Sequence, residues 1–400
     1  MKKIMILGGS EVIIPVIKKA QELGLYVITC DYIPTNLAHE YSDKYYNVSV
    51  VEKESVLEVA QREAIDGIIA FACDAGVVSA AYVAEKMGLP FQCSYEAAKI
   101  LQDKGLFRKF LQDNNFNSPK AKRYDDIDDA MKDADLFDYP VIVKPVDSAG
   151  SKGVTKVESK DELQKALEHA LDYSKGNAII VEKFLIFKGH HSSTDPFTVD
   201  GKLKFVSFSD QLFDEEADNP YAPTLIIWPS TMEDSAQKYL ADEMQRLFDL
   251  LKMKTGIYNI ETCVDIDGNP YLMEVSPRGG GCKIAELQEL AYGVPFIENE
   301  IRKAVNMPLL DMEQKALEGV WCELVLHSDQ EGIFEALEIT PEVKNKYVQM
   351  IDIGVKKGDV VKTFTGGNQA IGNLFLKADT REELDRLVSK QKEWIKIVLK

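Results

Sequence analysis

Short apolar runs alternate with helical periodicities over the N-terminal quarter of the chain. The runs are too short for helices and are bounded by glycine or proline, which predicts strands. Alternation of strands and helices predicts a parallel, doubly wound sheet. We expect its strands at residues 3–7, 26–30, 67–72 and 90–92, and its helices at about 12–23, 53–64 and 75–87.

The pattern changes beyond residue 94, where one helical stretch over 94–113 gives way to short strands and hairpins. Such a mixture indicates an α+β region. We expect strands at 121–124, 141–145, 154–157, 178–183, 197–200 and 202–208, helices at about 160–171, 233–251, 283–291 and 296–305, and a loop over 214–224. After Pro308 we expect a strand over 319–327, short strands with glycine turns over 331–377, a capped helix over 380–390 and a last strand over 394–399.

The chain of 400 residues is long enough for two or three domains. We predict an α/β domain over residues 1–100, an α+β domain over 101–310 and a small α+β unit over 311–400. Within the middle domain, a smaller lobe is expected at about 115–185.

Composition argues against several classes of function. The net charge of −18 argues against a general nucleic-acid binder. Six scattered cysteines without metal-ligand spacing are typical of reduced thiols in a cytoplasmic protein. We expect neither a signal peptide nor a membrane span, because no apolar run is long enough.

The segment 259–281 contains the most informative pattern, two apolar runs around Asp267-Gly268. A two-residue hairpin loop at that point would place Glu261 directly opposite Glu274. Opposed carboxylates lie roughly 4.5–5.5 Å apart at Cβ and repel each other, so a bridging cation such as Mg²⁺ is expected. Ser276 falls on the same face, and Arg278 leads into a glycine run that lets a ligand come close.

A simpler interpretation of this hairpin is that both glutamates are solvated. The opposite face could then pack into the core. Its residues are Ile260, Thr262, Val264, Ile266, Tyr271, Met273 and Val275.

Two further patterns suit a nucleotide. Lys144 ends a strand that leads into a loop of small residues, 147–153, whose backbone amides could approach phosphates. The pattern of a Walker P-loop is absent, and a flexible hairpin is an equal alternative. A second strand ends in Glu182-Lys183-Phe184-Leu185, which could line a purine slot or be an ordinary strand end. Gly8–Ser10, Asp31 and Asp74 lie at the carboxyl ends of the N-terminal strands, where ligands bind in such sheets. The first loop is not a full GxGxxG, and a tight turn without a ligand is an equal alternative there.

The order of these motifs resembles the ATP-grasp superfamily. It runs from a helical lysine, Lys104, through the Lys144 loop and the Glu182 strand end to the glutamate pair and Arg278. The resemblance covers residues 1–310 and extends to the C-terminal unit. It implies an N-terminal pre-ATP-grasp domain and a central two-lobed ATP-grasp domain.

The resemblance also implies roles for these residues. Lys104 and Lys144 would contact the phosphates of ATP, and Glu261 and Glu274 would hold Mg²⁺, with Mn²⁺ as an alternative. Arg278 and Lys144 would act in catalysis, the former on a carboxylate or an acyl phosphate. The remaining nucleotide contacts would come from Ser148, Gly150, Ser151, Gly153, Glu182, Lys183, Phe184, Leu185 and Met273.

Two positions depart from the superfamily's pattern. Ser276 stands where the superfamily usually has a metal-binding Asn, which puts a direct metal contact in doubt. His191 stands nearest to the place of a ribose-binding Glu, and it could bind a ribose hydroxyl or be an ordinary surface residue.

The activity implied is that of an ATP-dependent carbon–nitrogen ligase that forms ADP and phosphate. It would activate a carboxylate as an acyl phosphate for attack by an amine. The alternatives are a purine-pathway enzyme, either a phosphoribosylglycinamide synthetase or a transformylase, and a non-catalytic ATP-binding module. The expected partners are a small-molecule carboxylate and an amine, without nucleic acid or membrane, and a homodimer is one option for the assembly.

Overall fold

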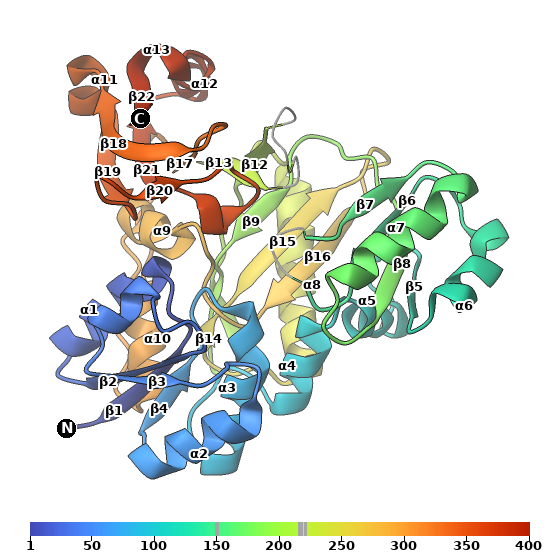
Figure 1. Cartoon of the computed structure of the whole chain (residues 1–400), viewed down its shortest axis with the longest axis horizontal. Helices are drawn as coiled ribbons and strands as arrows, with labels where there is room; N and C mark the ends of the chain where they lie inside the picture. Colours follow the sequence, from blue (N-terminus) through green and yellow to red (C-terminus); the bar gives the residue numbers. More distant parts are fainter. Residues whose placement is uncertain (149–151, 215–218, 220–221) are drawn as a thin grey trace.

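The computed structural model describes residues 1–148, 152–214, 219 and 222–400. Figure 1 shows an N-terminal block, a smaller lobe built from residues near 120–185 and a C-terminal unit, arranged around a central group of strands. The α/β fold with several antiparallel sheets agrees with the predicted fold class.

The N-terminal block contains a parallel sheet, as predicted. Its strand order is β3-β2-β1-β4. The edge strand β3 was missed because its sequence, Lys-Tyr-Tyr-Asn, has no apolar run. The strand expected at 90–92 does not form; instead, the Gln92 carbonyl accepts a hydrogen bond from the Lys254 amide at 2.8 Å. The strands are β1 (Lys3–Leu7), β2 (Tyr26–Asp31), β3 (Lys44–Asn47) and β4 (Gly67–Ile69).

The helix expected over 94–113 is two helices. Asp103 has an extended backbone, and its side chain accepts a hydrogen bond from the Leu106 amide at 2.9 Å, which caps the second helix. Lys104 therefore begins a helix instead of lying inside one. The helices of this region are η1 (Glu11–Ile13), α1 (Ile14–Glu22), η2 (Leu37–Glu40), α2 (Lys53–Glu63), α3 (Asp74–Met87), α4 (Tyr95–Gln102) and α5 (Lys104–Asp113).

The smaller lobe is an antiparallel sheet of order β5-β8-β6-β7. Leu163 and Leu167 lie on the apolar side of the helix α7, where they pack against Val143 and Val181 of the sheet. The lobe contains β5 (Ala121–Tyr124), α6 (Ile127–Lys132), η3 (Ala134–Leu136), β6 (Val141–Pro145), β7 (Thr155–Val157), α7 (Lys160–Asp172) and β8 (Ile179–Lys183).

The central strands form two small sheets, β16-β15-β9 and β11-β10-β14. The elements of this part are β9 (Ser192–Thr194), β10 (Phe197–Val199), β11 (Lys202–Phe205), α8 (Asp234–Leu251), β14 (Gly256–Ile257), β15 (Asn259–Val264), β16 (Pro270–Ser276), α9 (Ile284–Tyr292) and α10 (Phe296–Ala304).

One larger sheet, β12-β13-β17-β21-β19, joins the central part to the C-terminal unit. Residues 223–228 form a strand inside this sheet. The loop predicted over 214–224 therefore extends two residues too far, because residues 223 and 224 already belong to that strand. The remaining elements are β12 (Asp210–Phe213), β13 (Pro223–Trp228), β17 (Val320–Leu326), β18 (Gly332–Ile339), α11 (Pro341–Lys346), β19 (Val348–Ile353), β20 (Val360–Val361), η4 (Gly367–Gln369), β21 (Gly372–Ala378), α12 (Arg381–Ser389), α13 (Gln391–Trp394) and β22 (Ile395–Leu399).

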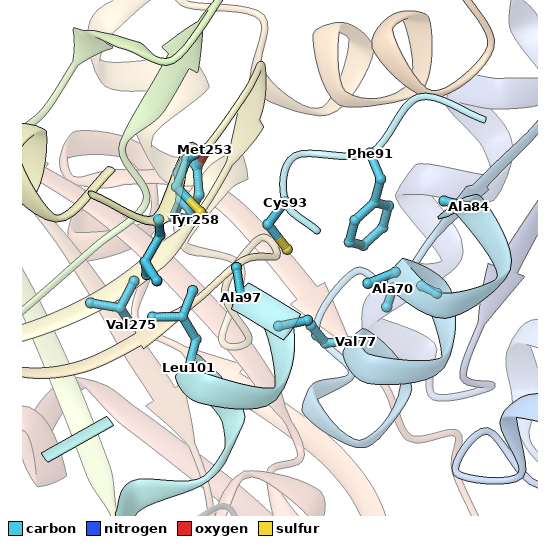
Figure 2. Packing of buried hydrophobic residues seen from close by; sticks show 14 of the residues in the cluster. Ala70, Val77, Ala84, Phe91, Cys93, Ala97, Leu101, Met253, Tyr258 and Val275 are labelled. Atoms are coloured by element: carbon cyan, nitrogen blue, oxygen red, sulfur yellow. The ribbon is translucent and has the colours of Figure 1, made fainter. Parts of the chain in front are cut away.

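A continuous apolar core connects the N-terminal block with the central strands. Figure 2 shows Leu101 of α4 beside Val275 of β16, with Val77 of α3 on the other side of α4. The core thereby fixes α4 and the start of α5 against the hairpin that contains the paired glutamates.

None of the helices in the described part of the chain combines the length and the apolar character needed to span a membrane.

Gly67 tests how closely the N-terminal sheet is packed. A methyl group at this position would clash with the backbone carbonyl oxygen of Ala304. We expect Gly67→Ala to lower the free energy of unfolding by about 1–3 kcal/mol, because a backbone atom cannot move aside cheaply. Gly367→Ala, which would meet open space, should change it by less than about 0.5 kcal/mol. Equal urea-unfolding midpoints for the two variants would contradict this packing.

Candidate functional site

A hairpin of β15 and β16 contains the acidic pair. Glu261 lies opposite Glu274, so the predicted pairing is confirmed. The predicted two-residue loop is wrong, because residues 265–269 connect the strands. The register shifts by one position next to Glu261, with Met273 as the extra residue on β16. This bulge restores the opposition of the two glutamates.

Asp265 organises the longer loop. Its carboxylate accepts hydrogen bonds from the amides of Asp267 at 3.0 Å and Asn269 at 2.8 Å, and from the Tyr271 hydroxyl at 2.8 Å. Ile266, expected on the core face, is instead 64% exposed because it lies at the loop tip. The other residues of that face are buried or half-buried: Ile260, Thr262, Val264, Tyr271, Met273 and Val275.

Nearby cations neutralise the paired carboxylates only in part. Burial and the neighbouring Glu274 raise the pKa of Glu261 to about 7. The Lys104 ammonium lies 3.5 Å from Glu274. Burial alone would lower the pKa of Lys104, but the carboxylates of Glu274, Asp74 and Glu261 outweigh it and raise that pKa. Two facing carboxylates with oxygen atoms only fit a hard divalent cation.

Lys104 also connects the hairpin to the predicted phosphate loop. Its ammonium donates a hydrogen bond to the Ser148 carbonyl at 3.1 Å, and its backbone amide donates to the Val146 carbonyl at 3.0 Å. The start of α5 is therefore attached to the end of β6, the strand that carries Lys144.

The loop after β6 is anchored at its base. Asp147 accepts hydrogen bonds from the Ser174 hydroxyl at 3.0 Å and the Gly176 amide at 2.7 Å. Gly153 has a positive φ of 71° and lies against Tyr173. Two residues predicted to contact phosphates, Gly150 and Ser151, lie outside the described residues.

Glu182 lies between two cations. Its carboxylate, 2% exposed, forms ion pairs with Lys144 and with Arg108, the latter at 2.9 Å. Burial would raise the pKa of Glu182, but Arg108 and Lys144 outweigh it and lower that pKa to about 2. Arg108 was missed in the sequence, although its position four residues after Lys104 puts both on one side of α5.

The strand end after Glu182 contains the predicted adenine hinge. Lys183 is exposed and pairs with Asp138 at 3.2 Å. The Phe184 amide donates to the Pro140 carbonyl at 3.1 Å, and the Leu185 side chain is buried. Met273 lies near this region through its carbonyl, which accepts a hydrogen bond from Arg108 at 2.8 Å.

His191 is in an aromatic cluster. Its ring lies 4.1 Å from that of Phe187 and 5.6 Å from that of Phe213, measured between centroids. Burial, helped by the nearby charge of Lys144, lowers the pKa of His191 to about 4. The imidazole is therefore neutral at physiological pH and can accept or donate a hydrogen bond.

Arg278 reaches back to the N-terminal block. Its guanidinium donates to both carboxylate oxygens of Asp74, at 2.8 and 2.7 Å. Ser276 donates to the same carboxylate at 2.8 Å and accepts from Gln102 at 2.7 Å, so its hydroxyl is already engaged. Burial would raise the pKa of Asp74, but the Arg278 charge and these hydrogen bonds lower it. Asp74 begins α3 after β4, the strand end at which a ligand was expected.

Asp195 supports the glycine run behind Arg278. It accepts hydrogen bonds from the Gly280 amide at 2.6 Å and from Asn259 at 2.9 Å. Burial raises the pKa of Asp195 to about 7 in spite of these donors. The sequence gives little signal for this residue, because it lies far from the hairpin along the chain.

Comparison with known proteins gives one family match. Residues 111–294 match the family described as the D-ala D-ala ligase C-terminus. This range includes Lys144, Glu182 and the whole glutamate hairpin.

This chain aligns with about a quarter of one curated relative and with nearly the whole of another. The carbamoyl phosphate synthase large chain of Thermotoga petrophila is 23% identical over 302 residues, which is 75% of this chain and 26% of the synthase. The chain thus spans about a quarter of that protein's length. The formate-dependent phosphoribosylglycinamide formyltransferase of Bacteroides thetaiotaomicron is 25% identical over 403 residues, with 98% of both chains covered.

The fold also matches that of solved structures. The crystal structure of an L-amino acid ligase from Bacillus licheniformis has a TM-score of 0.82 at 19% identity, covering 100% of this chain and 99% of that chain. The similarity extends over the C-terminal unit as well.

A substitution at Arg108 tests the buried ion cluster of Arg108, Glu182 and Lys144. We expect Arg108→Met to lower the free energy of unfolding by about 3 kcal/mol, because it leaves part of the Glu182 charge without a partner. The double variant Arg108→Met/Glu182→Gln should recover at least half of this loss. Lys109→Met on the same helix breaks an exposed pair, 71% and 58% exposed, and should cost less than about 1 kcal/mol. Urea unfolding compares the four proteins, and a double variant less stable than Arg108→Met would contradict the arrangement.

His191 gives a pH prediction. Its folded pKa of about 4 lies below the ordinary value of about 6.5, so the unfolded chain takes up a proton first as the pH falls. The histidine's contribution to stability is complete above about pH 6.5 and declines down to about pH 4. The difference in unfolding free energy between the wild type and His191→Gln should therefore move against the wild type between pH 7 and pH 4.5. A difference that stays constant across this range would contradict the neutral, half-buried imidazole.

Proposed function

We propose that this chain, whose residues 111–294 match the D-ala D-ala ligase C-terminus, is a member of the ATP-grasp superfamily and an ATP-dependent carbon–nitrogen ligase that forms ADP and phosphate. The observation that carries this proposal is the convergence of the Glu261–Glu274 pair with Lys104, Lys144 and Arg278. Phosphoryl transfer depends mostly on positioning and charge neutralisation, which such a set of groups can supply.

The nucleotide would bind between the smaller lobe and the hairpin. Glu261 and Glu274 would hold Mg²⁺, which supplies further neutralisation of the phosphate charge when bound. Lys104 and Lys144 would contact phosphate oxygens, together with Ser148 and Gly153, which lie on either side of the residues outside the description. Lys144 is paired with Glu182 before ATP binds, so the phosphates would compete with Glu182 for this ammonium.

The base and ribose would lie at the strand end after Glu182. Lys183, Phe184 and Leu185 would line the adenine slot, with Met273 on the opposite wall. His191 would offer a neutral imidazole to a ribose hydroxyl. Ser276 would reach a metal ion only after leaving Asp74, to which it donates a hydrogen bond.

The reaction would proceed in two steps. An oxygen of the substrate carboxylate attacks the γ-phosphorus of ATP, the bond to the β–γ bridging oxygen breaks, and ADP leaves. The amine then attacks the acyl carbon, the carbon–oxygen bond to phosphate breaks, and the nitrogen loses a proton. Lys144 would stabilise the transferred phosphoryl group, and Arg278 would orient the carboxylate and stabilise the acyl phosphate.

A purine-pathway activity is the second candidate, because the formyltransferase relative aligns over nearly the whole chain. A ribose phosphate would require basic groups beyond those that bind ATP. Two basic groups near the glycine run already have acidic partners: Arg278 pairs with Asp74 and Lys283 with Asp352. The acidic groups around Arg278 and Lys283 thus cancel their positive charge, and a phosphate bound there would lack the Mg²⁺ that neutralises the phosphates of ATP, which favours a substrate without a phosphate. A non-catalytic ATP-binding module would have no need for the intact acidic pair and Arg278.

Phosphate release separates these candidates. The protein would be incubated with Mg-ATP and pairs drawn from the common amino acids, then with phosphoribosyl amines. Release with an amino-acid pair supports the ligase proposed here, and release only with a ribonucleotide supports the purine alternative. Release with neither would overturn the ligase assignment.

Glu274 tests the acidic pair directly. We expect Glu274→Gln to reduce turnover by at least about 100-fold, because it removes one of two charged oxygen donors to Mg²⁺. The matched control is Glu338→Gln, an exposed glutamate on β18, which should keep wild-type turnover. Steady-state phosphate release at saturating Mg-ATP is the measurement. Full activity in Glu274→Gln would refute the metal assignment.

A further inference from the structure

The strand β17 presents two different faces. Cys322 and Leu324 pack into the core of the C-terminal unit. Trp321 packs toward the central part of the molecule. Because side chains alternate along a strand, Glu323 shares the face of Trp321 and points toward the central part.

Glu323 is buried without a partner. Its side chain is 0% exposed, and among the described residues no donor forms a hydrogen bond with either carboxylate oxygen. Its neighbours in register, Ile226 and Phe375, are apolar. Leaving a carboxylate in such surroundings costs several kcal/mol, so a group of this kind calls for an explanation.

The start of α9 faces the same region of β17 and adds more negative charge. Lys283 is 3% exposed, and its ammonium lies 2.9 Å from Asp352 and 3.5 Å from Glu286. The nearer Glu286 oxygen has no well-aligned hydrogen bond among the described residues. Three acidic side chains, those of Glu286, Glu323 and Asp352, thus lie around Lys283. Burial, with a smaller effect from Glu286, raises the pKa of Glu323 well above its ordinary value, and a bound cation would stabilise its ionised form.

This cluster adjoins the proposed reaction site. Lys283 follows the glycine run that begins after Arg278. Asp195, which holds Gly280, is close enough to interact electrostatically with both Arg278 and Glu323. Figure 1 places α9 directly beneath the C-terminal sheet that contains β17. Asp352, with its side chain 46% exposed, is the member of the cluster in contact with solvent.

The hydrogen-bonding capacity and the charge of the acidic cluster indicate which kind of ligand it would bind. Carboxylates only accept hydrogen bonds, and a primary ammonium offers three donors together with one positive charge. A hydroxyl would supply a donor but leave the charge uncompensated. An ammonium therefore matches both the missing donors and the missing charge.

We propose that Glu323, together with Glu286, binds the primary ammonium group of a substrate. The inference rests on the ligase function proposed above and deepens it. The ammonium could belong to the attacking amine, or to an amino acid whose carboxylate is activated beside Arg278. Both sources share the same recognition chemistry.

Glu323→Gln tests the subsite in kinetics. The amide keeps the shape and removes the charge, and folding should tolerate it because it also removes an unpaired buried carboxylate. We expect the KM of the ammonium-bearing substrate to rise about 10- to 100-fold, the loss typical of a charge-assisted hydrogen bond. The KM of ATP should stay unchanged. If only the KM of the amine substrate rises, the subsite binds the attacking amine. If only the KM of the acid substrate rises, the subsite binds the α-ammonium group of that acid. Unchanged KM values for both substrates would overturn the proposal.

A binding experiment decides the proposal independently of turnover. Thermal unfolding would be followed with Mg-ADP and each common L-amino acid or methylamine, and with the matched hydroxy acids lactate and glycolate. We expect at least one amine to raise the Tm of the wild type while its hydroxy analogue does not. This protection should vanish in Glu323→Gln and persist in Glu338→Gln. Protection by no amine, or protection retained in Glu323→Gln, would refute the subsite, whereas failure of phosphate release alone would refute only the ligase function.

Discussion

The site depends on one constraint: two like charges are held opposite each other on neighbouring strands. The opposition of Glu261 and Glu274 is favourable only when positive charge lies close by, and the surrounding elements supply it. The break at Asp103 places Lys104 at the start of α5, within ion-pair distance of Glu274. The apolar contacts of α4 with β16 keep that start in place.

The cations of the site are all paired before any ligand arrives. Lys144 is with Glu182, Arg278 with Asp74, and Lys104 with Glu274. Binding of anionic groups would therefore exchange one partner for another and would not bury free charges. Such an exchange avoids most of the desolvation that makes isolated buried ions expensive, and it keeps the side chains ordered in advance.

The sequence was sufficient for the fold class, the parallel N-terminal sheet and the pairing of the two glutamates, because each follows from local periodicity or from the position of a turn. The hairpin loop was wrong in length because Asp265 stabilises a longer turn and a bulge at Met273 compensates for it. Arg108 and Asp195 were not identified as site residues, and Asp74 was placed at a strand end where ligands bind but not as the partner of Arg278. Their roles come from contacts between segments far apart in the chain, which no short window of sequence encodes. Glu323 was missed for the same reason, since its surroundings come from β13, β21 and α9.

The sheet that joins β12 and β13 to β17, β21 and β19 has a consequence for how this protein can be altered. Removal of everything after residue 310 would remove β17, the neighbour of β13. The apolar strand β13 would then have unpaired backbone N–H and C=O groups along one edge, which promotes aggregation. The C-terminal unit is consequently not a detachable module. A chimera designed to change substrate preference would have to transplant β12 and β13 together with the C-terminal strands, so the two regions are expected to evolve as a single inherited block.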